Sequence, residues 1–235
     1  MKTLAILSRK GGTGKTTLAI HLAVAAQADG RRTLLADTDR QHSALEWRRE
    51  RRDATPIVEA VKPGALFARQ QEARRAGFNL MVVDTGPSVE EEVEQAVRCA
   101  DVCLVVARPN FFDIRAVAES AALADRFHRP VAFVLNQAPH RRESIEAPVL
   151  MESVKALRGL GFPVLPIGLR SRAAYQAAAA SGRAAQEFDP DGTAGSEMTA
   201  LWRHVSDRLW PAPVRAVTET AYRPTPVFQA APTRP

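Results

Sequence analysis

The sequence predicts an α/β fold with a mostly parallel, twisted β-sheet that helices cover on both faces. Short apolar runs alternate with segments of helical pattern along the chain, and strands that are apolar throughout are typical of parallel sheets buried on both faces. A glycine-rich turn joins the first apolar run to the first helical segment. In this order of strand, turn and helix, backbone amides can bind an anion.

Six apolar runs are the expected strands, and the sixth is the least clear because it contains prolines. In chain order they are Leu4–Leu7, Thr33–Ala36, Leu80–Val83, Cys103–Ala107, Val131–Leu135 and Pro163–Ile167. Helices are expected at residues 15–28, 43–52, 64–75, 89–98, 113–127, 143–159, 171–180 and 195–208. The first ends at Gly30 and the seventh near Gly182, since glycine commonly follows a helix. Ser88 is the expected N-cap of the fourth.

The 235 residues are expected to form one domain, residues 1–210, and a tail, residues 211–235. The tail holds six prolines and shows no helical periodicity, which favours a flexible segment. Tyr222 and Phe228 lie among these prolines and could anchor a partner.

The composition favours a cytoplasmic protein. Apolar residues make up 46% of the chain, yet no apolar run approaches the ~20 residues that span a membrane, and the first residues are too short an apolar segment for a signal peptide. Without an export signal, Cys99 and Cys103 are expected to be reduced structural thiols. The five histidines are scattered, so they indicate no metal site.

The net charge of +6 has two interpretations. One is an ordinary solvated surface, and the other is attraction to nucleic acid through its phosphates. Arg48, Arg49, Arg51 and Arg52 form a run of charge that we expect to be a solvated helix face. Composition alone does not choose between the two interpretations.

The turn between the first strand and the first helix predicts a phosphate-binding loop. Its residues are Lys10, Gly11, Gly12, Thr13, Gly14, Lys15, Thr16 and Thr17. The glycines allow backbone N–H groups to approach an anion closely. Lys15 supplies a positive charge for the β- and γ-phosphates, and the Thr16 hydroxyl is a ligand for Mg²⁺. A nucleotide bound with Mg²⁺ is therefore the expected ligand of this loop.

Carboxylates follow the second and third expected strands. Asp37 and Asp39 are two residues apart on an extended segment, so both point to one side, at the strand end where α/β sheets place ligands. Two like charges there require a cation, and Asp37 is a candidate magnesium ligand. Asp84 ends the next strand and would hold a magnesium-bound water or Thr16. A plain acidic turn remains the alternative for the first pair.

These motifs resemble those of the ParA/MinD family of ATPases. The loop KGGTGKTT resembles the family's deviant Walker A P-loop, in which Lys10 would reach across a dimer to the partner's nucleotide. The stretch from Asp37 to Gln41 resembles switch I, which implies that Asp39 orients the attacking water. Arg40 in switch I and Gly86 in the segment after Asp84 stand where the family usually has prolines. The sequence therefore does not establish how stiff these two segments are.

The resemblance extends over about residues 1–210 and implies a P-loop NTPase fold. Asn136 follows a strand where the family uses an asparagine to recognise adenine, although asparagine suits many strand-to-loop turns. The segment from Arg170 to Gly182 resembles one found in the short partition ATPases that lack an N-terminal helix-turn-helix domain. The family contacts DNA through basic residues, and Arg170 and Arg172 are the best candidates here.

The function implied is that of an ATPase with weak intrinsic activity, in which Lys10, Lys15 and Asp39 carry the chemistry. ATP would close a homodimer that binds DNA without sequence preference, and a ParB-like or other adaptor protein would stimulate hydrolysis. The cargo would be a plasmid, a chromosome region or a protein cluster, and the protein would be associated with the nucleoid.

Two other functions remain as alternatives. A MinD-like membrane switch requires a C-terminal amphipathic helix, which the proline-rich tail does not offer, so no stable membrane association is expected. A metabolic synthase or reductase of the same superfamily would need other residues, and Cys99 and Cys103 do not match the widely separated cysteines of the nitrogenase iron protein.

Overall fold

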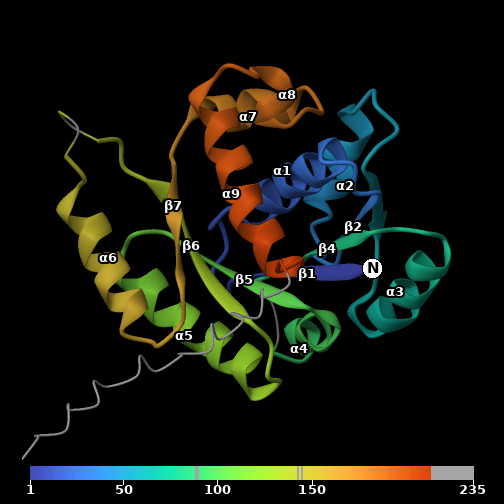
Figure 1. The fold of residues 1–235 in the computed structure, drawn as a ribbon, viewed down its shortest axis with the longest axis horizontal. Coiled ribbons are helices and arrows are strands. Elements are labelled where there is room, and N and C mark those ends of the chain that lie inside the picture. Colours follow the sequence, from blue (N-terminus) through green and yellow to red (C-terminus); the bar gives the residue numbers. More distant parts are fainter. Residues whose placement is uncertain (88–89, 142, 144, 213–235) are drawn as a thin grey trace, which may run out of the picture.

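The computed structural model describes residues 1–87, 90–141, 143 and 145–212. Its centre is a seven-stranded sheet in which every pair of neighbouring strands is parallel. The order across the sheet is β3-β2-β4-β1-β5-β6-β7 (Figure 1). The strands are β1 (Lys2–Leu7), β2 (Thr33–Asp37), β3 (Ile57–Ala60), β4 (Leu80–Asp84), β5 (Val102–Ala107), β6 (Val131–Ala138) and β7 (Val164–Arg170).

Helices cover both faces of this sheet. One face carries α1 (Lys15–Ala28), α2 (Ser43–Glu50), α7 (Ala173–Ala180), α8 (Ala185–Phe188) and α9 (Thr193–Leu209). The other carries the short 3₁₀ helix η1 (Pro63–Ala65), α3 (Leu66–Arg75), α4 (Glu90–Cys99), α5 (Phe111–Arg126) and α6 (Pro148–Arg158). Alternate residues of a strand point to opposite faces, so Leu4 and Ile6 pack into the first core and Ala5 and Leu7 into the second.

The predicted fold class is confirmed. The elements that differ from the prediction, one strand and the start of one helix, differ for physical reasons. β3 was not predicted because it is a short edge strand, and none of its four residues is fully buried. α6 begins at Pro148 rather than at residue 143, since proline is well suited to the first helical position. Ser88 and residues 213–235 of the tail lie outside the described residues.

Two further predictions can be compared with the structure. Cys99 and Cys103 are free thiols, as expected, and burial raises the pKa of Cys103 to about 12. Among the described residues, no helix combines the length and the apolar character needed to cross a membrane.

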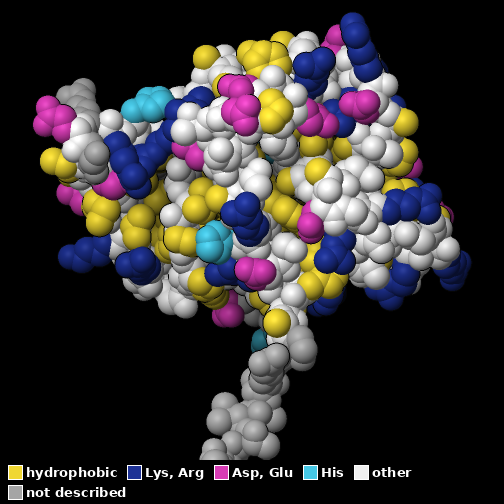
Figure 2. All heavy atoms as spheres, turned by 45° about the horizontal axis from the view of Figure 1, so that its top comes forward, with side chains coloured by type: hydrophobic (Ala, Val, Ile, Leu, Met, Phe, Trp, Pro, Cys, Tyr) yellow, Lys and Arg dark blue, Asp and Glu magenta, His cyan; other side chains and the backbone are white. Residues whose placement is uncertain are grey.

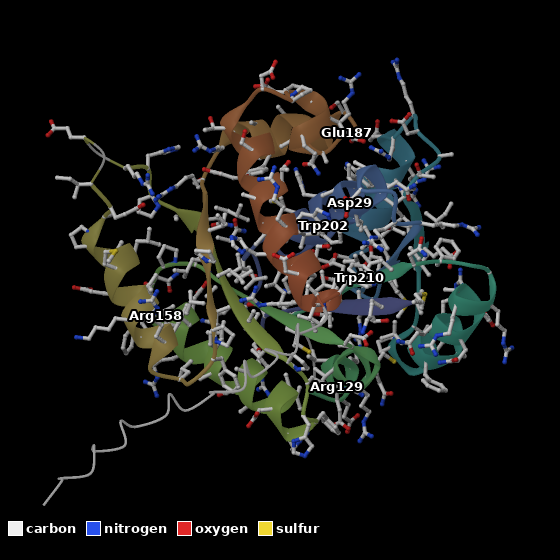
Figure 3. The ribbon with its side chains drawn as sticks, in the orientation of Figure 1. Asp29, Arg129, Arg158, Glu187, Trp202 and Trp210 are labelled. Carbon is white, nitrogen blue, oxygen red and sulfur yellow. The ribbon has the colours of Figure 1, made fainter. Side chains whose placement is uncertain are left out.

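The prediction of a fully solvated arginine run is wrong for Arg51. α2 ends at Glu50, and the Arg51 side chain is only 4% exposed. Its guanidinium donates two hydrogen bonds to the Glu187 carboxylate, at 2.7 and 2.8 Å, and Glu187 lies at α8, facing α2 (Figure 3). The same group also lies 5.0 Å from the ring centroid of Trp47. Arg51 therefore joins α2 to α8.

Gly182 completes this junction, because its backbone packs directly on the end of α2. Its φ is +64°, and a Cβ added there would lie 2.3 Å from the backbone of Glu50 and Arg51. Its carbonyl accepts a hydrogen bond from Arg51 at 3.0 Å. Only glycine fits this combination of left-handed backbone and close approach.

His21 is a fully buried titratable group of α1. One ring nitrogen, Nδ1, lies 2.7 Å from the Thr17 carbonyl and so donates to it, whereas the buried Nε2 has no hydrogen-bond partner among the described residues. Burial lowers the pKa of His21 to about 4, so the native protein keeps this ring neutral.

We expect His21 to make the protein less stable as the pH falls from 6.5 towards 4. In that range the unfolded histidine, with a pKa near 6.5, binds a proton that the native state excludes. Between pH 7 and pH 5 this lowers the free energy of unfolding by about 2 kcal/mol. Urea unfolding at both pH values measures this decrease in the free energy of unfolding. The decrease should be smaller in His21→Gln, which has no imidazole at this position. An equal loss in both proteins would contradict this role for His21.

Candidate nucleotide-binding site

The candidate site lies at the carboxyl ends of the central strands. The loop after β1 and the segments after β2 and β4 come together there, because parallel neighbours end on the same edge of the sheet. They enclose a cavity of about 440 Å³. Its lining includes Gly11, Gly12, Gly14, Lys15, Thr16, Thr17, Ile20, His21, Asp39, Gln41, Ser43, Trp47, Pro87 and Ala179. Three larger cavities, of about 890, 710 and 490 Å³, have no residue of this loop in their lining.

Lys15 is held in the loop as a buried cation. Its residue is 6% exposed, and its Nζ donates to the Lys10 carbonyl at 3.2 Å. Burial lowers the pKa of this ammonium, while the carboxylates of Asp84 and Asp39 act in the opposite direction. A buried cation of this kind gains from an anionic ligand, because the ligand replaces lost hydration.

The end of β6 fixes the loop from behind. Asn136 Nδ2 donates to the Thr13 carbonyl at 2.7 Å, and Gln137 Nε2 donates to the Gly12 carbonyl at 2.8 Å. Gly14 has φ +89°, and a Cβ there would lie 2.2 Å from the Asn136 amide. Asn136 therefore holds the loop in this structure. Its predicted contact with adenine stays a prediction.

Asp84 is the strongest indication of a cation in the site. It is fully buried, and neither carboxylate oxygen has a hydrogen-bond partner among the described residues. Burial raises the pKa of Asp84 to about 7; the Thr16 hydroxyl and the Lys15 ammonium lower it, whereas the Asp37 carboxylate adds to the rise. Orphaned buried oxygens of this type are rare unless a ligand or ion satisfies them.

Asp37 and Asp39 differ in what they contact. The Asp37 carboxylate accepts hydrogen bonds from the backbone amides of Asp39, Ala44 and Leu45, at 3.1, 3.1 and 3.2 Å. It therefore caps the first turn of α2. Asp39 is only partly buried and lines the cavity, and its Oδ1 accepts from the Gln41 amide at 3.0 Å.

These residues fit a magnesium–nucleotide. Mg²⁺ is usually held by one or two carboxylates, several waters and the phosphates of a substrate. The orphaned oxygens of Asp84 and the nearby Thr16 hydroxyl offer that kind of donor set. Asp37 remains a proposed ligand, although its oxygens already serve three amides.

Lys10 is placed differently from Lys15. It is exposed, its side chain is not part of the cavity lining, and its Nζ lies 5.9 Å from the ring centroid of Phe112 on α5. In a single chain this ammonium therefore lies beside Phe112 and takes no part in the lining of the cavity.

The two departures from the family pattern are accommodated locally. Arg40 is exposed and donates to Glu92 of α4 at 2.6 Å, so an ion pair connects the segment after β2 to the helix after β4. Gly86 is buried, and the following Pro87 lines the cavity. Exposed ion pairs contribute little stability, so this connection is easily broken.

Arg170 and Arg172 are engaged by carboxylates within the chain. Arg170 is 8% exposed and donates to both oxygens of Glu146, at 2.6 and 2.8 Å. Arg172 donates to both oxygens of Glu197, at 3.1 and 2.7 Å. Their role in binding DNA stays a prediction, and it would require phosphates to compete with these two glutamates.

Sequence reasoning missed several residues of the site. Gln137 and His21 were missed because neither belongs to a motif itself, although Gln137 follows Asn136 and His21 lies one helical turn after Thr17. The role of Trp47 depends on a contact distant in the sequence, since its Nε1 donates to the Arg183 carbonyl at 3.1 Å. Trp47 lies only six residues after Gln41 in the sequence, but its place in the cavity wall could not be derived from spacing.

Comparison with known proteins is consistent with this geometry. The family profile described as "CobQ/CobB/MinD/ParA nucleotide binding domain" matches residues 4–185. The chain is 32% identical over 217 residues to maintenance of carboxysome distribution protein A from Gloeobacter kilaueensis, covering 88% of this chain and 94% of the relative. It is 28% identical over 147 residues to the chromosome-partitioning ATPase Soj from Thermus thermophilus, covering 50% and 59%.

Solved structures share the fold. McdA from Cyanothece without nucleotide superposes with a TM-score of 0.74 at 15% identity, over 89% of this chain and 99% of the other. The septum site-determining protein MinD from Pyrococcus horikoshii, complexed with Mg-ADP, gives a TM-score of 0.69 at 16% identity, over 87% and 95%. The seven-stranded parallel sheet is thus that of a P-loop NTPase, as the sequence predicted.

Proposed function

Because the chain belongs to the CobQ/CobB/MinD/ParA family of nucleotide-binding proteins, we propose that it is an ATP-dependent dimerisation switch that positions a cargo. ATP closes a homodimer, the dimer binds DNA without sequence preference, and a partner adaptor protein stimulates a slow intrinsic hydrolysis. The cargo is a plasmid, a chromosome region or a protein assembly. The names of two relatives, which refer to carboxysome distribution and chromosome partitioning, support this class of cargo.

The observation that carries the proposal is the division of labour between the two lysines. Lys15 is buried in the loop, where it meets the phosphates of its own nucleotide. Lys10 is exposed outside that cavity, so its charge is free to act on the nucleotide of a second chain.

The residues of the site divide the remaining work. Thr16 and Asp84 hold Mg²⁺, which neutralises charge on the phosphates when bound. Asp39 orients a water molecule for attack, while Lys15 and the partner's Lys10 stabilise the charge that develops on the transferred phosphoryl group. Asp37 keeps α2 in place behind Asp39, through the amides of Ala44 and Leu45 that it binds.

DNA binding requires more phosphate contacts than the surface of a single chain offers. Figure 2 shows basic side chains spread over one face of the molecule with acidic ones between them. A single chain would offer few phosphate contacts there. A rigid dimer doubles them, which raises the apparent affinity through effective concentration.

We expect the chain to bind unrelated DNA duplexes with ATP and Mg²⁺, much more weakly with ADP, and less as salt rises. Arg172→Gln should lower the affinity for all sequences and reduce the salt slope by about 1, as expected for one lost phosphate contact. Glu197→Gln is the matched variant, since it releases Arg172 from its carboxylate and should strengthen binding. Arg170→Glu is less suitable, because it would place a buried carboxylate beside that of Glu146.

Surface-binding titrations at several salt concentrations measure these effects. Equal binding in the ATP and ADP states would remove the nucleotide switch from the proposal. Loss of affinity in both Arg172→Gln and Glu197→Gln would instead assign the pair a structural role.

A further inference from the structure

Two phenylalanines at the start of α5 are presented to solvent. Phe111 is 67% exposed and Phe112 is 71% exposed, and no other large apolar side chain among the described residues is more exposed than Phe112. Their rings pack edge to face, with centroids 5.5 Å apart. Exposed aromatic pairs on a soluble protein commonly mark an interaction site.

The backbone that carries these rings is held firmly. Asn110 caps α5, since its side chain accepts from the Asp113 amide at 3.0 Å. Arg108 donates to both oxygens of Asp113, at 2.7 and 3.1 Å, and Asp113 is only 2% exposed. The rings are therefore displayed on a fixed platform, so little ordering is needed when a partner binds.

This platform borders the nucleotide loop. The Lys10 Nζ lies 5.9 Å from the ring centroid of Phe112. On the same side, Arg108 approaches Gly12 closely enough that a Cβ there would lie 4.0 Å from its Nη1. A molecule that reaches Lys10 from outside must therefore also come close to Phe112.

We propose that Phe111 and Phe112 form the apolar anchor by which a second copy of this chain docks when both copies carry ATP. The inference rests on the proposed function, in which Lys10 acts on the partner's nucleotide. A partner whose phosphates reach Lys10 covers the neighbouring rings. In a two-fold dimer both copies contribute the same patch, so each nucleotide site is completed by the partner's Lys10 and sealed beside both rings.

The charges around the rings make this contact depend on nucleotide. Lys10 flanks Phe112, and the Arg115 guanidinium lies 5.9 Å from the ring centroid of Phe111. Two copies that approach without nucleotide bring like charges together, which opposes docking. ATP supplies negative charge between the two patches and removes that opposition.

The size of the patch also suits a switch. With ~200 Å² per ring and the exposed fractions above, four rings bury on the order of 500 Å². Stable protein interfaces bury about 1,600 Å², so the rings alone cannot hold two chains together. Phosphate contacts must supply the rest, and hydrolysis can then release the dimer.

The experiment compares the double variant Phe111→Ser/Phe112→Ser with Phe67→Ser. Phe67 is 64% exposed and lies on α3, well apart from α5 in Figure 1, so it controls for the loss of an exposed ring. Sedimentation velocity with Mg²⁺ and a slowly hydrolysed ATP analogue measures the dimer dissociation constant. We expect an increase of at least tenfold in the double variant and less than twofold in Phe67→Ser.

Two further measurements exclude loss of the fold or of the nucleotide site. Circular dichroism should be unchanged, and binding of a fluorescent ATP analogue to dilute, monomeric protein should be within twofold of wild type. Phe111→Leu/Phe112→Leu should dimerise within a fewfold of wild type, because it keeps most of the apolar area.

The outcomes separate this inference from the proposed function. A wild-type chain that dimerises with the analogue, together with a double variant that dimerises equally well, would overturn the role of the rings alone. If the double variant dimerises normally but no longer binds lipid vesicles or an adaptor protein, Phe111 and Phe112 are the contact site for that partner instead. A wild-type chain that stays monomeric in every nucleotide state would overturn both proposals.

Discussion

Lys15→Ala should abolish measurable ATP binding. The Lys15 ammonium is buried in the loop, and its own contact within the chain is one carbonyl. Removing a desolvated charge opposite a bound phosphate costs about 2–5 kcal/mol or more, so we expect an affinity loss of at least about 30-fold. Isothermal titration with ATP and Mg²⁺ measures it.

Two controls show that this loss belongs to the site. The free energy of unfolding without nucleotide should not fall, because burial already disfavours this ammonium, as its lowered pKa indicates. Lys155→Ala removes an exposed lysine of α6 and should leave ATP affinity unchanged. Unchanged affinity in Lys15→Ala would contradict the assignment of the phosphate-binding loop.

Asp39→Ala should bind ATP but hydrolyse it at least about 100-fold more slowly, the usual scale for losing a group that positions or deprotonates the nucleophile. Asp39 lines the cavity and keeps one carboxylate oxygen outside its contact with the Gln41 amide. The variant should accumulate as an ATP-bound dimer, because release depends on hydrolysis. Phosphate release at saturating ATP measures the effect.

Asp37→Ala is the informative contrast. Because Asp37 caps α2 through backbone amides, its loss should lower the free energy of unfolding by about 1–2 kcal/mol. Asp39→Ala should leave the free energy of unfolding unchanged. Turnover of Asp39→Ala at the wild-type rate would show that another group positions the water.

Much of the fold followed from the sequence, because buried parallel strands are apolar throughout and the glycine loop follows the first of them. β3 was not predicted, because its residues are partly exposed at the edge of the sheet and do not form a fully apolar run. Arg51 was assigned to solvent because its partner Glu187 is 136 residues away, a distance that no local pattern bridges.

The site was predictable to the level of residue type and less so to the level of role. Spacing brought Asp37 and Asp39 together but could not show that one binds the amides of α2 while the other faces the cavity. Likewise, spacing alone did not distinguish Lys10 from Lys15, and only the family resemblance gave the two lysines different roles. Their separation into an outward and a buried cation depends on Phe112 and on the fold of the loop.

The central claim is that ATP brings two chains together so that Lys10 of each acts on the other's nucleotide. The most direct test is sedimentation of the wild-type chain and of Lys10→Ala with Mg²⁺ and either ADP or a slowly hydrolysed ATP analogue. The account predicts a wild-type monomer with ADP, a wild-type dimer with the analogue, and a Lys10→Ala chain that binds the analogue yet stays monomeric. A Lys10→Ala chain that dimerises and hydrolyses ATP like wild type would contradict it.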